Sequence, residues 1–402
     1  MDAPTLQPKF LPSRNELGLV AVGFCGGQGK SGVDAAPMAL IESGLVEQLR
    51  EELEFNVHYD GEVHQYADIM PKEDPVYRGM KNSRAVSAVT QRLSEQVYEH
   101  ARQGRFVLTL GGDHSIAIGT ISGTAKAIRE RTGREMAVIW VDAHADINTP
   151  ETSDSGNIHG MPVAFLTGLA KEDKEDCFGW IKDDQRVSVK KLVYIGLRDI
   201  DRGEKKILRE HGIKAFSMHD IDRYGIGKVM DMALGWIGSD TPIHLSFDID
   251  SLDPMWAPST GTPVRGGLTL REGDFIAECV HETGSLVALD LVEVNPSLES
   301  HGASETVRAE SAERVGVGAD LFKLVHTSSP LVYRPPAQRY PIMHATRFYQ
   351  STGKPLVAQY QHSPTHNLFA LFFITAKYLS VSSSSPHDSA ASIFIFRQVQ
   401  MS

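Results

Sequence analysis

The sequence predicts an α/β fold built around a mostly parallel sheet, and three observations support this. Over residues 17–295 one theme repeats: a short apolar run, a turn rich in Gly or Asp, and a polar-apolar stretch at helical spacing. Most of the apolar runs are continuous rather than alternating, as expected of strands that are buried on both faces of a parallel sheet. Chemically reactive residues follow several of the runs, at the strand ends where open sheets of this kind bind ligands.

Six apolar runs are expected to form the strands. In chain order they are LVAVGF from Leu19, FVLTLGG from Phe106, MAVIWVD from Met136, LVYIGLRD from Leu192, PIHLSFDID from Pro242 and LVALDLVEVN from Leu286. Apolar positions at helical spacing predict helices over residues 82–103 and 115–131, and a third helix over 270–282. The alternation of these elements predicts one α/β unit rather than several small domains.

The composition changes after about residue 316. Residues 317–402 carry seven basic and two acidic side chains, a surplus of +5 that leaves the first 316 residues at −16. The same segment holds seven prolines and a serine run at residues 382–385, without a sustained helical or strand period. We therefore expect one domain over residues 1–316 and a divergent, poorly ordered extension over 317–402.

Composition and charge exclude several classes of protein. The 402 residues are 41% hydrophobic and 23% charged, which is typical of a soluble globular chain and not of a collagen, a coiled coil or a disordered protein. Lys and Arg total 40 against 51 Asp and Glu, so the formal net charge is −11. This balance argues against a nucleic-acid partner and favours a small cationic substrate.

Cysteine usage and the distribution of apolar residues indicate the compartment. Cys25, Cys177 and Cys279 are too few and too widely spaced for a disulfide framework or a thiolate zinc site, so a reducing environment fits best. The amino end lacks a signal-peptide pattern, and no window reaches the roughly 20 apolar residues of a membrane helix. We expect a cytoplasmic protein with no membrane partner.

Carboxylates and imidazoles gather at three of the predicted strand ends. They are His114 in GGDHS, Asp142, His144 and Asp146 in DAHAD, and Asp248 and Asp250 in SFDID. Side chains two apart on an extended chain share a face, so each set can point at one centre. A lone Asp or His here would be a turn or capping residue, but four Asp at one edge need cations to offset their charge. The pattern therefore predicts a metal cluster.

The donor set indicates the metal and its chemistry. Carboxylates and imidazoles without a thiolate favour a hard-to-borderline divalent ion, manganese before zinc. Four Asp roughly neutralise two such ions. Two metals that share a bridging water lower its pKa and present hydroxide near neutral pH, which predicts metal-assisted hydrolysis and leaves the substrate open.

A Gly-rich segment, VGFCGGQGKSG, invites a different interpretation as a phosphate-binding loop. That loop needs a Gly five positions before Gly29, where this chain has Phe24, and Gly23 lies one position too far away. A Gly-rich strand-to-helix turn is the favoured interpretation, and a nucleotide-binding protein is a remote alternative.

Five motifs occur in the order and at about the spacing found in the ureohydrolases. They are GGDHS, DAHADIN, SGNIHGMP, SFDIDSLDP and EVNPSL. The chain resembles this family, and most closely its arginases, over roughly residues 17–308. The resemblance implies a three-layer α/β/α fold around a mostly parallel sheet of about eight strands. It also implies two manganese ions, a homotrimer, and hydrolysis of L-arginine to L-ornithine and urea by a metal-bridging hydroxide.

The resemblance also implies roles for individual residues. His114, Asp142, Asp146 and Asp248 are expected on one manganese, and His144, Asp142, Asp248 and Asp250 on the other, so Asp142 and Asp248 would bridge. Asp146 is expected to accept the hydroxide proton, and His159 resembles the proton-shuttling histidine of the family. Glu293 resembles the carboxylate that holds the substrate guanidinium.

Substrate choice depends on the loop that follows DAHADIN. By the same resemblance, Asn148 and Ser155 match positions that bind an α-carboxylate, Asp199 matches the position near the α-amino group, and Thr262 is expected to line the site. The alternatives are an agmatinase, whose substrate lacks that carboxylate, a guanidinobutyrase, and a non-catalytic isoform with an altered C-terminus. Arg271 and Glu272 match positions of intersubunit salt bridges, or form an exposed pair at a helix start.

Overall fold

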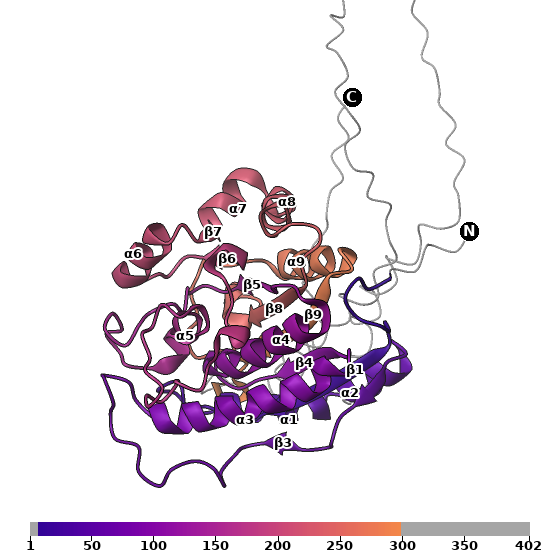
Figure 1. Ribbon diagram of the computed structural model, residues 1–402. Helices are drawn as coiled ribbons and strands as arrows, with labels where there is room; N and C mark the ends of the chain where they lie inside the picture. The colour runs from indigo at the N-terminus through magenta and orange to yellow at the C-terminus, as the bar shows by residue number, and fades with distance from the viewer. Residues whose placement is uncertain (1–6, 299–402) are drawn as a thin grey trace, which may run out of the picture. The chain divides into compact units, whose positions relative to one another are not determined.

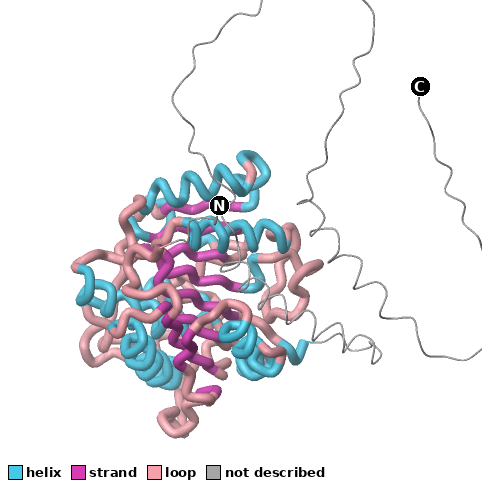
Figure 2. Tube along the Cα trace, turned by 90° about the vertical axis from the view of Figure 1, so that its right-hand side faces the viewer, coloured by secondary structure: helices cyan, strands magenta, loops and turns pink. Residues whose placement is uncertain are grey.

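A computed structural model of the chain describes residues 7–298, which form a sheet covered by helices on both faces (Figure 1). The strands run through the middle of the fold with helices on either side (Figure 2). The predicted boundary at residues 316 and 317, and the predicted extension over 317–402, lie outside the described residues. Within residues 7–298 we find no helix that combines the length and hydropathy required of a transmembrane span.

All of the pairings between the nine strands are parallel, which confirms the predicted fold class. The strand order is β2-β1-β4-β9-β8-β5-β6-β7, and β3 pairs with β1 beside this path. In chain order the strands are β1 (Glu16–Val22), β2 (Asn56–His58), β3 (Val63–His64), β4 (Phe106–Leu110), β5 (Ala137–Val141), β6 (Leu192–Leu197), β7 (Lys214–Ser217), β8 (Ile243–Asp248) and β9 (Leu286–Val292). All six predicted strands are present, and β2, β3 and β7 are additional.

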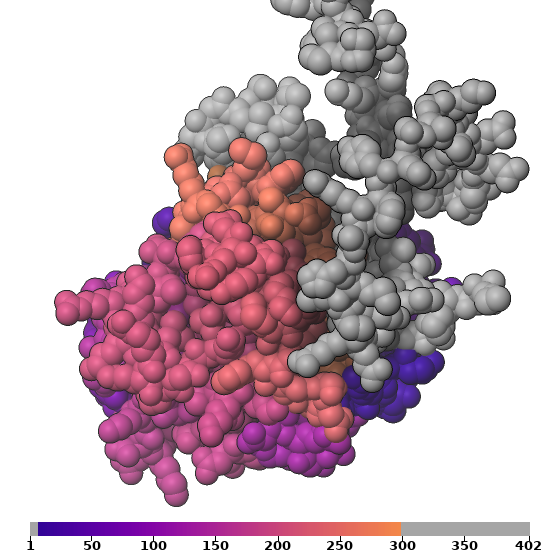
Figure 3. Space-filling view, turned by 90° about the horizontal axis from the view of Figure 1, so that it is seen from above, coloured from indigo at the N-terminus to yellow at the C-terminus, as the bar shows by residue number. Residues whose placement is uncertain are grey.

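Nine α-helices lie within the described residues. They are α1 (Ala36–Glu42), α2 (Leu45–Glu51), α3 (Ser83–Arg102), α4 (Ala117–Thr132), α5 (Pro162–Thr167), α6 (Arg202–Glu210), α7 (Met218–Tyr224), α8 (Ile226–Ile237) and α9 (Leu270–Glu282). The three predicted helices are confirmed as α3, α4 and α9. Viewed from above (Figure 3), segments coloured magenta to salmon, from the middle of the chain, form much of the described surface.

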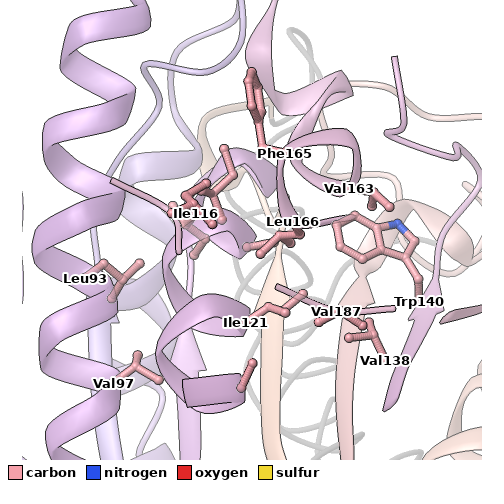
Figure 4. Packing of buried hydrophobic residues seen from close by; sticks show 14 of the residues in the cluster. Leu93, Val97, Ile116, Ile121, Val138, Trp140, Val163, Phe165, Leu166 and Val187 are labelled. Atoms are coloured by element: carbon pink, nitrogen blue, oxygen red, sulfur yellow. The ribbon is translucent and has the colours of Figure 1, made fainter. Parts of the chain in front are cut away.

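Two hydrophobic clusters, one on each face of the sheet, hold the layers together. Helices α3, α4 and α5 contribute to one cluster, and α1, α2, α7, α8 and α9 contribute to the other. In the first cluster, Leu93 of α3 and Ile121 of α4 lie in the same packed layer as Trp140 of β5 (Figure 4). Burial of such side chains stabilises the fold by about 1.5–3 kcal/mol each.

Close packing of α3 against α4 depends on two glycines of α4. A Cβ atom at Gly119 would lie 2.5 Å from the Thr90 carbonyl oxygen, and one at Gly123 would lie 2.4 Å from that of Ser94. Both contacts are with backbone atoms of α3, so neither can be relieved by a rotamer change. This close approach fixes the position of α4 over the central strands. His114 lies in the turn directly before α4, so its position is fixed as well.

Candidate active site

The predicted metal ligands and Glu293 follow four strands that are neighbours in the middle of the sheet, in the order β4-β9-β8-β5. His114 lies just beyond β4, Glu293 directly follows β9, Asp248 ends β8, and Asp142 directly follows β5. Because the strands are parallel, their carboxyl ends meet at one edge of the sheet. The sheet therefore brings together residues that are up to 179 positions apart in the chain.

His114 faces three carboxylates with one ring nitrogen. Its Nδ1 lies 3.1 Å from Asp142 Oδ2, 3.1 Å from Asp248 Oδ2 and 3.3 Å from Asp146 Oδ2. The imidazole stacks on the Trp140 ring at a centroid distance of 4.0 Å, and its Nε2 lies 3.0 Å from Ser246 Oγ. One nitrogen can carry only one proton, so a single imidazole cannot satisfy three buried carboxylate oxygens.

A second group forms around His144. Its Nδ1 lies 3.3 Å from Asp142 Oδ1 and 3.2 Å from Asp250 Oδ2, and the latter oxygen also accepts a hydrogen bond of 2.8 Å from Thr262 Oγ1. Potential ligand atoms of His114, Asp142 and Asp146 lie within 4.8 Å of one another, and so do those of Asp142, His144 and Asp250. Asp142 thus contributes one oxygen to each group. This arrangement fits two adjacent cations that share a carboxylate.

The pKa values of these carboxyl groups show that a buried site with several carboxylates disfavours their ionised forms. Burial, together with repulsion from Asp142, raises the pKa of the Asp146 carboxyl well above its usual range. Burial and neighbouring carboxylates also raise the pKa of Asp248 and that of Asp250. For Asp142 burial acts in the same direction, but hydrogen bonds from His114 and His144 outweigh it and lower the pKa. Bound cations would stabilise all four as carboxylates.

Glu293 is a fifth carboxylate at this edge of the sheet and is held by three donors. Its Oε1 accepts a hydrogen bond of 2.9 Å from the His114 backbone N–H and lies 3.2 Å from His159 Nδ1. Its Oε2 accepts a hydrogen bond of 2.8 Å from Gln28 Nε2. Burial opposes ionisation of Glu293, but the hydrogen bond from His159 lowers its pKa, whereas the same contact raises the pKa of His159 against the effect of burial.

A pocket lies beside the cluster, and most of the other predicted site residues line it. It is lined by His144, Asp146, Asn148, Ser153, Ser155, His159, Gly160, Asp199, Asp201, Glu204, Asp248 and Thr262. Asn148 donates from Nδ2 to Asp201 Oδ2 at 2.9 Å and accepts from Thr152 Oγ1 at 2.9 Å. The many carboxylates of this lining favour a cationic ligand.

The structure adds residues that the sequence analysis did not single out. Asp201 lies beside Asn148, whereas Asp199 lies at the rim, with its Oδ2 3.9 Å from His144 Nε2. Asp201 and Glu204 form the capping box of α6, and burial raises the pKa of Glu204 to about 7. Their D-x-x-E spacing is visible in the sequence but indicates a helix start, not a pocket.

The Gly-rich segment that resembled a phosphate-binding loop lies against this site. The Gly27 N–H donates to Asp113 Oδ2 at 2.8 Å, and the Gly27 carbonyl accepts from the His159 N–H at 3.0 Å. Because Gln28 also donates to Glu293, the segment holds the Asp113 and Glu293 carboxylates in position. Burial and the nearby Glu293 carboxylate raise the pKa of Asp113 to about 6.

The fold and site together define a class: a parallel α/β protein whose strand ends hold a buried cluster of carboxylates and imidazoles suited to metal ions. Comparison with known proteins gives the family. The model of the Arginase family matches residues 15–315. We conclude that this chain belongs to the arginase family.

Individual relatives agree with that assignment. The arginase of Neurospora crassa is 73% identical over 326 residues, which span 80% of this chain and 91% of the relative. The arginase of Coccidioides posadasii is 73% identical over 305 residues, spanning 76% and 94%. Among solved structures, a cold-adapted arginase from Glaciozyma antarctica is 41% identical, with a TM-score of 0.63, covering 82% of this chain and all 100% of the other.

Proposed function

We propose that this protein is a manganese-dependent arginase that hydrolyses the guanidinium group of L-arginine to L-ornithine and urea. The observation that carries the proposal is the pair of ligand groups that share Asp142 at the carboxyl edge of the sheet. The relatives that are named arginase, at 73% identity, support the same reaction.

The donor set supports a pair of manganese ions. We assign His114, Asp142, Asp146 and Asp248 to one ion and His144, Asp142, Asp248 and Asp250 to the other. Oxygen and imidazole donors without thiolate suit manganese, and the four carboxylates balance the charge of two dications. When bound, the ions supply Lewis acidity and lower the pKa of a water so that it becomes a nucleophile at neutral pH.

The protein groups around that water bind the substrate and move protons. The Glu293 carboxylate, ionised and buried, is suited to a guanidinium, and His159 beside it is exposed to the pocket. The contact with Glu293 raises the pKa of His159, so this side chain can deliver a proton to the departing amine. Asp146 faces His114 and lines the pocket, and we assign it the role of accepting the proton of the attacking water.

The rest of the pocket accounts for the choice of L-arginine. Asn148 and Ser155 lie on the loop over the pocket and are assigned the α-carboxylate, and Asp199 is assigned the neighbourhood of the α-amino group. Thr262 holds Asp250 through its hydroxyl and forms one wall. We further propose that the enzyme is a cytoplasmic homotrimer; sedimentation of the intact chain tests the oligomeric state.

The deciding experiment measures urea release by the full-length protein with L-arginine and with agmatine in parallel. Before the assay the protein is stripped of metal and divided into aliquots that receive Mn²⁺, Zn²⁺ or no metal. We expect release from L-arginine with Mn²⁺ and little release without metal. Turnover of agmatine alone would replace arginase by another ureohydrolase, and absence of turnover in every aliquot would favour a non-catalytic isoform.

A further inference from the structure

The loop over residues 148–157 carries both groups that we assign to the substrate carboxylate, so its position matters for substrate choice. Its outer part is held by short-range hydrogen bonds: the Thr152 and Ser153 N–H groups both donate to the Thr149 carbonyl, at 3.0 and 3.1 Å. Thr152 Oγ1 in turn donates to Asn148 Oδ1 at 2.9 Å. A shift of this turn would therefore move Asn148 directly.

A second segment, residues 77–81, lies along this loop with its backbone in contact. The Lys81 N–H donates to the Gly156 carbonyl at 2.9 Å. Gly156 has a φ of 71°, and a Cβ atom there would lie 2.1 Å from the Gly79 carbonyl oxygen. Because both the conformation and the space require glycine, the two segments are fitted to each other rather than merely adjacent.

Arg78 occupies the tip of that segment in an unusual backbone conformation. Its φ is 50°, in the left-handed region that few residues other than glycine adopt. Reciprocal hydrogen bonds of 3.0 and 2.9 Å between Tyr77 and Met80 close the turn around it. This conformation costs about 1 kcal/mol or more, so the contacts of the side chain must offset it.

The Arg78 guanidinium joins the loop to a separate anchor. Nη2 lies 2.7 Å from Glu151 Oε1 on the loop, while Nη1 lies 2.7 Å from Glu172 Oε1 and donates to the Lys171 carbonyl at 2.9 Å. The Glu172 side chain is only 4% exposed, whereas that of Glu151 is 61% exposed. We call the contacts of Arg78 with Glu151, Glu172 and Lys171 the Arg78 clamp.

The exposure of Glu151 suggests a simpler interpretation, in which its ion pair with Arg78 is a surface contact that contributes little free energy. The anchor argues against this. Since Glu172 and the Lys171 carbonyl already fix one edge of the planar guanidinium, little side-chain entropy is lost when the other edge binds Glu151. An exposed pair between two free side chains would lack that preorganisation.

We propose that Arg78 is a positioning residue for substrate selectivity: through Glu151 it holds the loop in the conformation that presents Asn148 and Ser155 to the α-carboxylate. The inference rests on the proposed arginase function. Because Arg78 acts on the carboxylate end of the substrate and not on the reacting guanidinium, its loss should affect KM for L-arginine and spare kcat.

The test compares kinetics of the wild-type enzyme with those of R78A, R78K and E151Q. In R78A we expect KM for L-arginine to rise about fivefold, which corresponds to the upper range of an exposed ion pair, with kcat within about twofold. The inhibition constant of agmatine, which lacks the carboxylate, should stay within about twofold. R78K should recover part of the loss because it keeps the charge without the planar fork.

Two further variants make the result specific to the Arg78 clamp. E151Q removes the negative charge of the exposed loop partner and leaves Arg78 on Glu172, so it should reproduce part of the KM effect even if R78A folds poorly. The double variant R78A/E151Q should be no worse than R78A alone, since both substitutions act on the same contact. The matched control R102A removes an exposed arginine that pairs with Glu99 at the end of α3, and its kinetics should equal those of the wild type.

Three outcomes overturn the inference. If KM for L-arginine is unchanged in both R78A and E151Q while the wild type is active, the clamp does not position the loop and the proposed function stands. If KM for L-arginine and the agmatine inhibition constant rise together, Arg78 supports the whole pocket rather than carboxylate recognition. If the metal-loaded wild type releases no urea from L-arginine, the proposed function fails and this inference fails with it.

Discussion

The Glu293 carboxylate has both oxygens engaged within the protein. His114 and His159 lie at one oxygen, and Gln28 donates to the other. All three contacts come from N–H groups. Three donors around one carboxyl group favour its ionised form, because hydrogen bonds to a charged acceptor are the stronger ones. A guanidinium can add to this arrangement because a carboxylate oxygen has further lone-pair directions.

Replacing Glu293 by Gln should lower kcat/KM for L-arginine about 10²-fold. The amide brings an NH₂ group against donors that need an acceptor, and losing one partner of a buried charged contact costs about 3 kcal/mol or more. Urea release by E293Q, with circular dichroism to verify the fold, measures the effect. Glu210→Gln, at an exposed position on α6, is the matched control. Activity within threefold of wild type would contradict the assignment of Glu293.

His100 should make the protein less stable in mild acid. Burial and the nearby Arg105 guanidinium lower its pKa to about 4, and Arg105 Nη1 lies 3.0 Å from His100 Nδ1. Because the ordinary value is 6.5, the unfolded chain binds more protons between pH 6.5 and 4, so stability falls as the pH falls through that window. At pH 5 the loss from this residue should be about 1–2 kcal/mol.

Urea denaturation of wild type and H100Q at several pH values measures this effect. The glutamine keeps an acceptor for Arg105 but does not titrate, so the free energy of unfolding should depend less on pH in H100Q between pH 6.5 and 4. His211→Gln, at an exposed position, should leave the wild-type pH dependence unchanged. Identical pH profiles for H100Q and wild type would show that His100 is not held neutral.

At the scale of elements, the start of α9 shows how local sequence fixes a boundary. The Glu272 N–H donates to Thr269 Oγ1 at 3.2 Å, and the Thr269 N–H donates to Glu272 Oε2 at 2.9 Å, which is a capping box. Arg271 Nη2 lies 3.9 Å from Glu272 Oε1. Glu272 is thus engaged within its own helix, in keeping with the interpretation of Arg271 and Glu272 as a helix-start pair.

Thr269→Ala should lower the free energy of unfolding by about 1 kcal/mol, because one N–H at the start of α9 loses its acceptor. The helix packs on the sheet beside β8, so the loss should appear in the global unfolding transition followed in urea. Thr269→Ser keeps the hydroxyl and should stay within about 0.5 kcal/mol of wild type. An alanine variant as stable as the serine variant would contradict the role of the cap.

The elements that the sequence predicts are the long or fully buried ones. The strands β4, β5, β6, β8 and β9 are buried at every position and are read as continuous apolar runs. The strands that it misses, β2, β3 and β7, have two to four residues and partial exposure, so no period can be seen in them. β1 begins at Glu16, before the apolar run, because Glu16 and Leu17 pair with β2.

The missed helices have comparable physical reasons. Helices α1, α2 and α7 have seven residues and α5 has six, which is two turns or fewer and too short for an amphipathic pattern. Helix α8 is longer but contains Gly227 and Gly235, which weaken helix propensity. These helices form because the sheet face beside them has apolar surface to bury, which local sequence does not reveal.

At the scale of the whole molecule, a metal pair should stabilise the fold. Burial and mutual repulsion work against the ionised forms of Asp146, Asp248 and Asp250, and cations relieve both. A ligand at about 100 times its Kd adds about 2.7 kcal/mol, so saturating Mn²⁺ should raise the Tm of the metal-free protein by about 5 °C or more. Differential scanning calorimetry of stripped and reloaded protein measures the shift.

Two controls attribute that shift to the site. NaCl at matched ionic strength should not reproduce it, because general screening does not fill the cluster. Asp142→Asn removes the carboxylate shared by both ligand groups, so Mn²⁺ should shift its Tm much less. An equal shift in the wild type and in D142N would place the stabilising ion elsewhere in the molecule.

The α/β class, the six main strands and the six candidate metal ligands could be predicted from the sequence, because burial on both faces and residues two apart at a strand end are local patterns. The further groups that join the site became known only from the folded structure. Gln28 lies 265 positions from Glu293, and Arg78 lies 73 positions from Glu151. Such contacts depend on how the sheet and its loops bring distant segments together, and no local period encodes them.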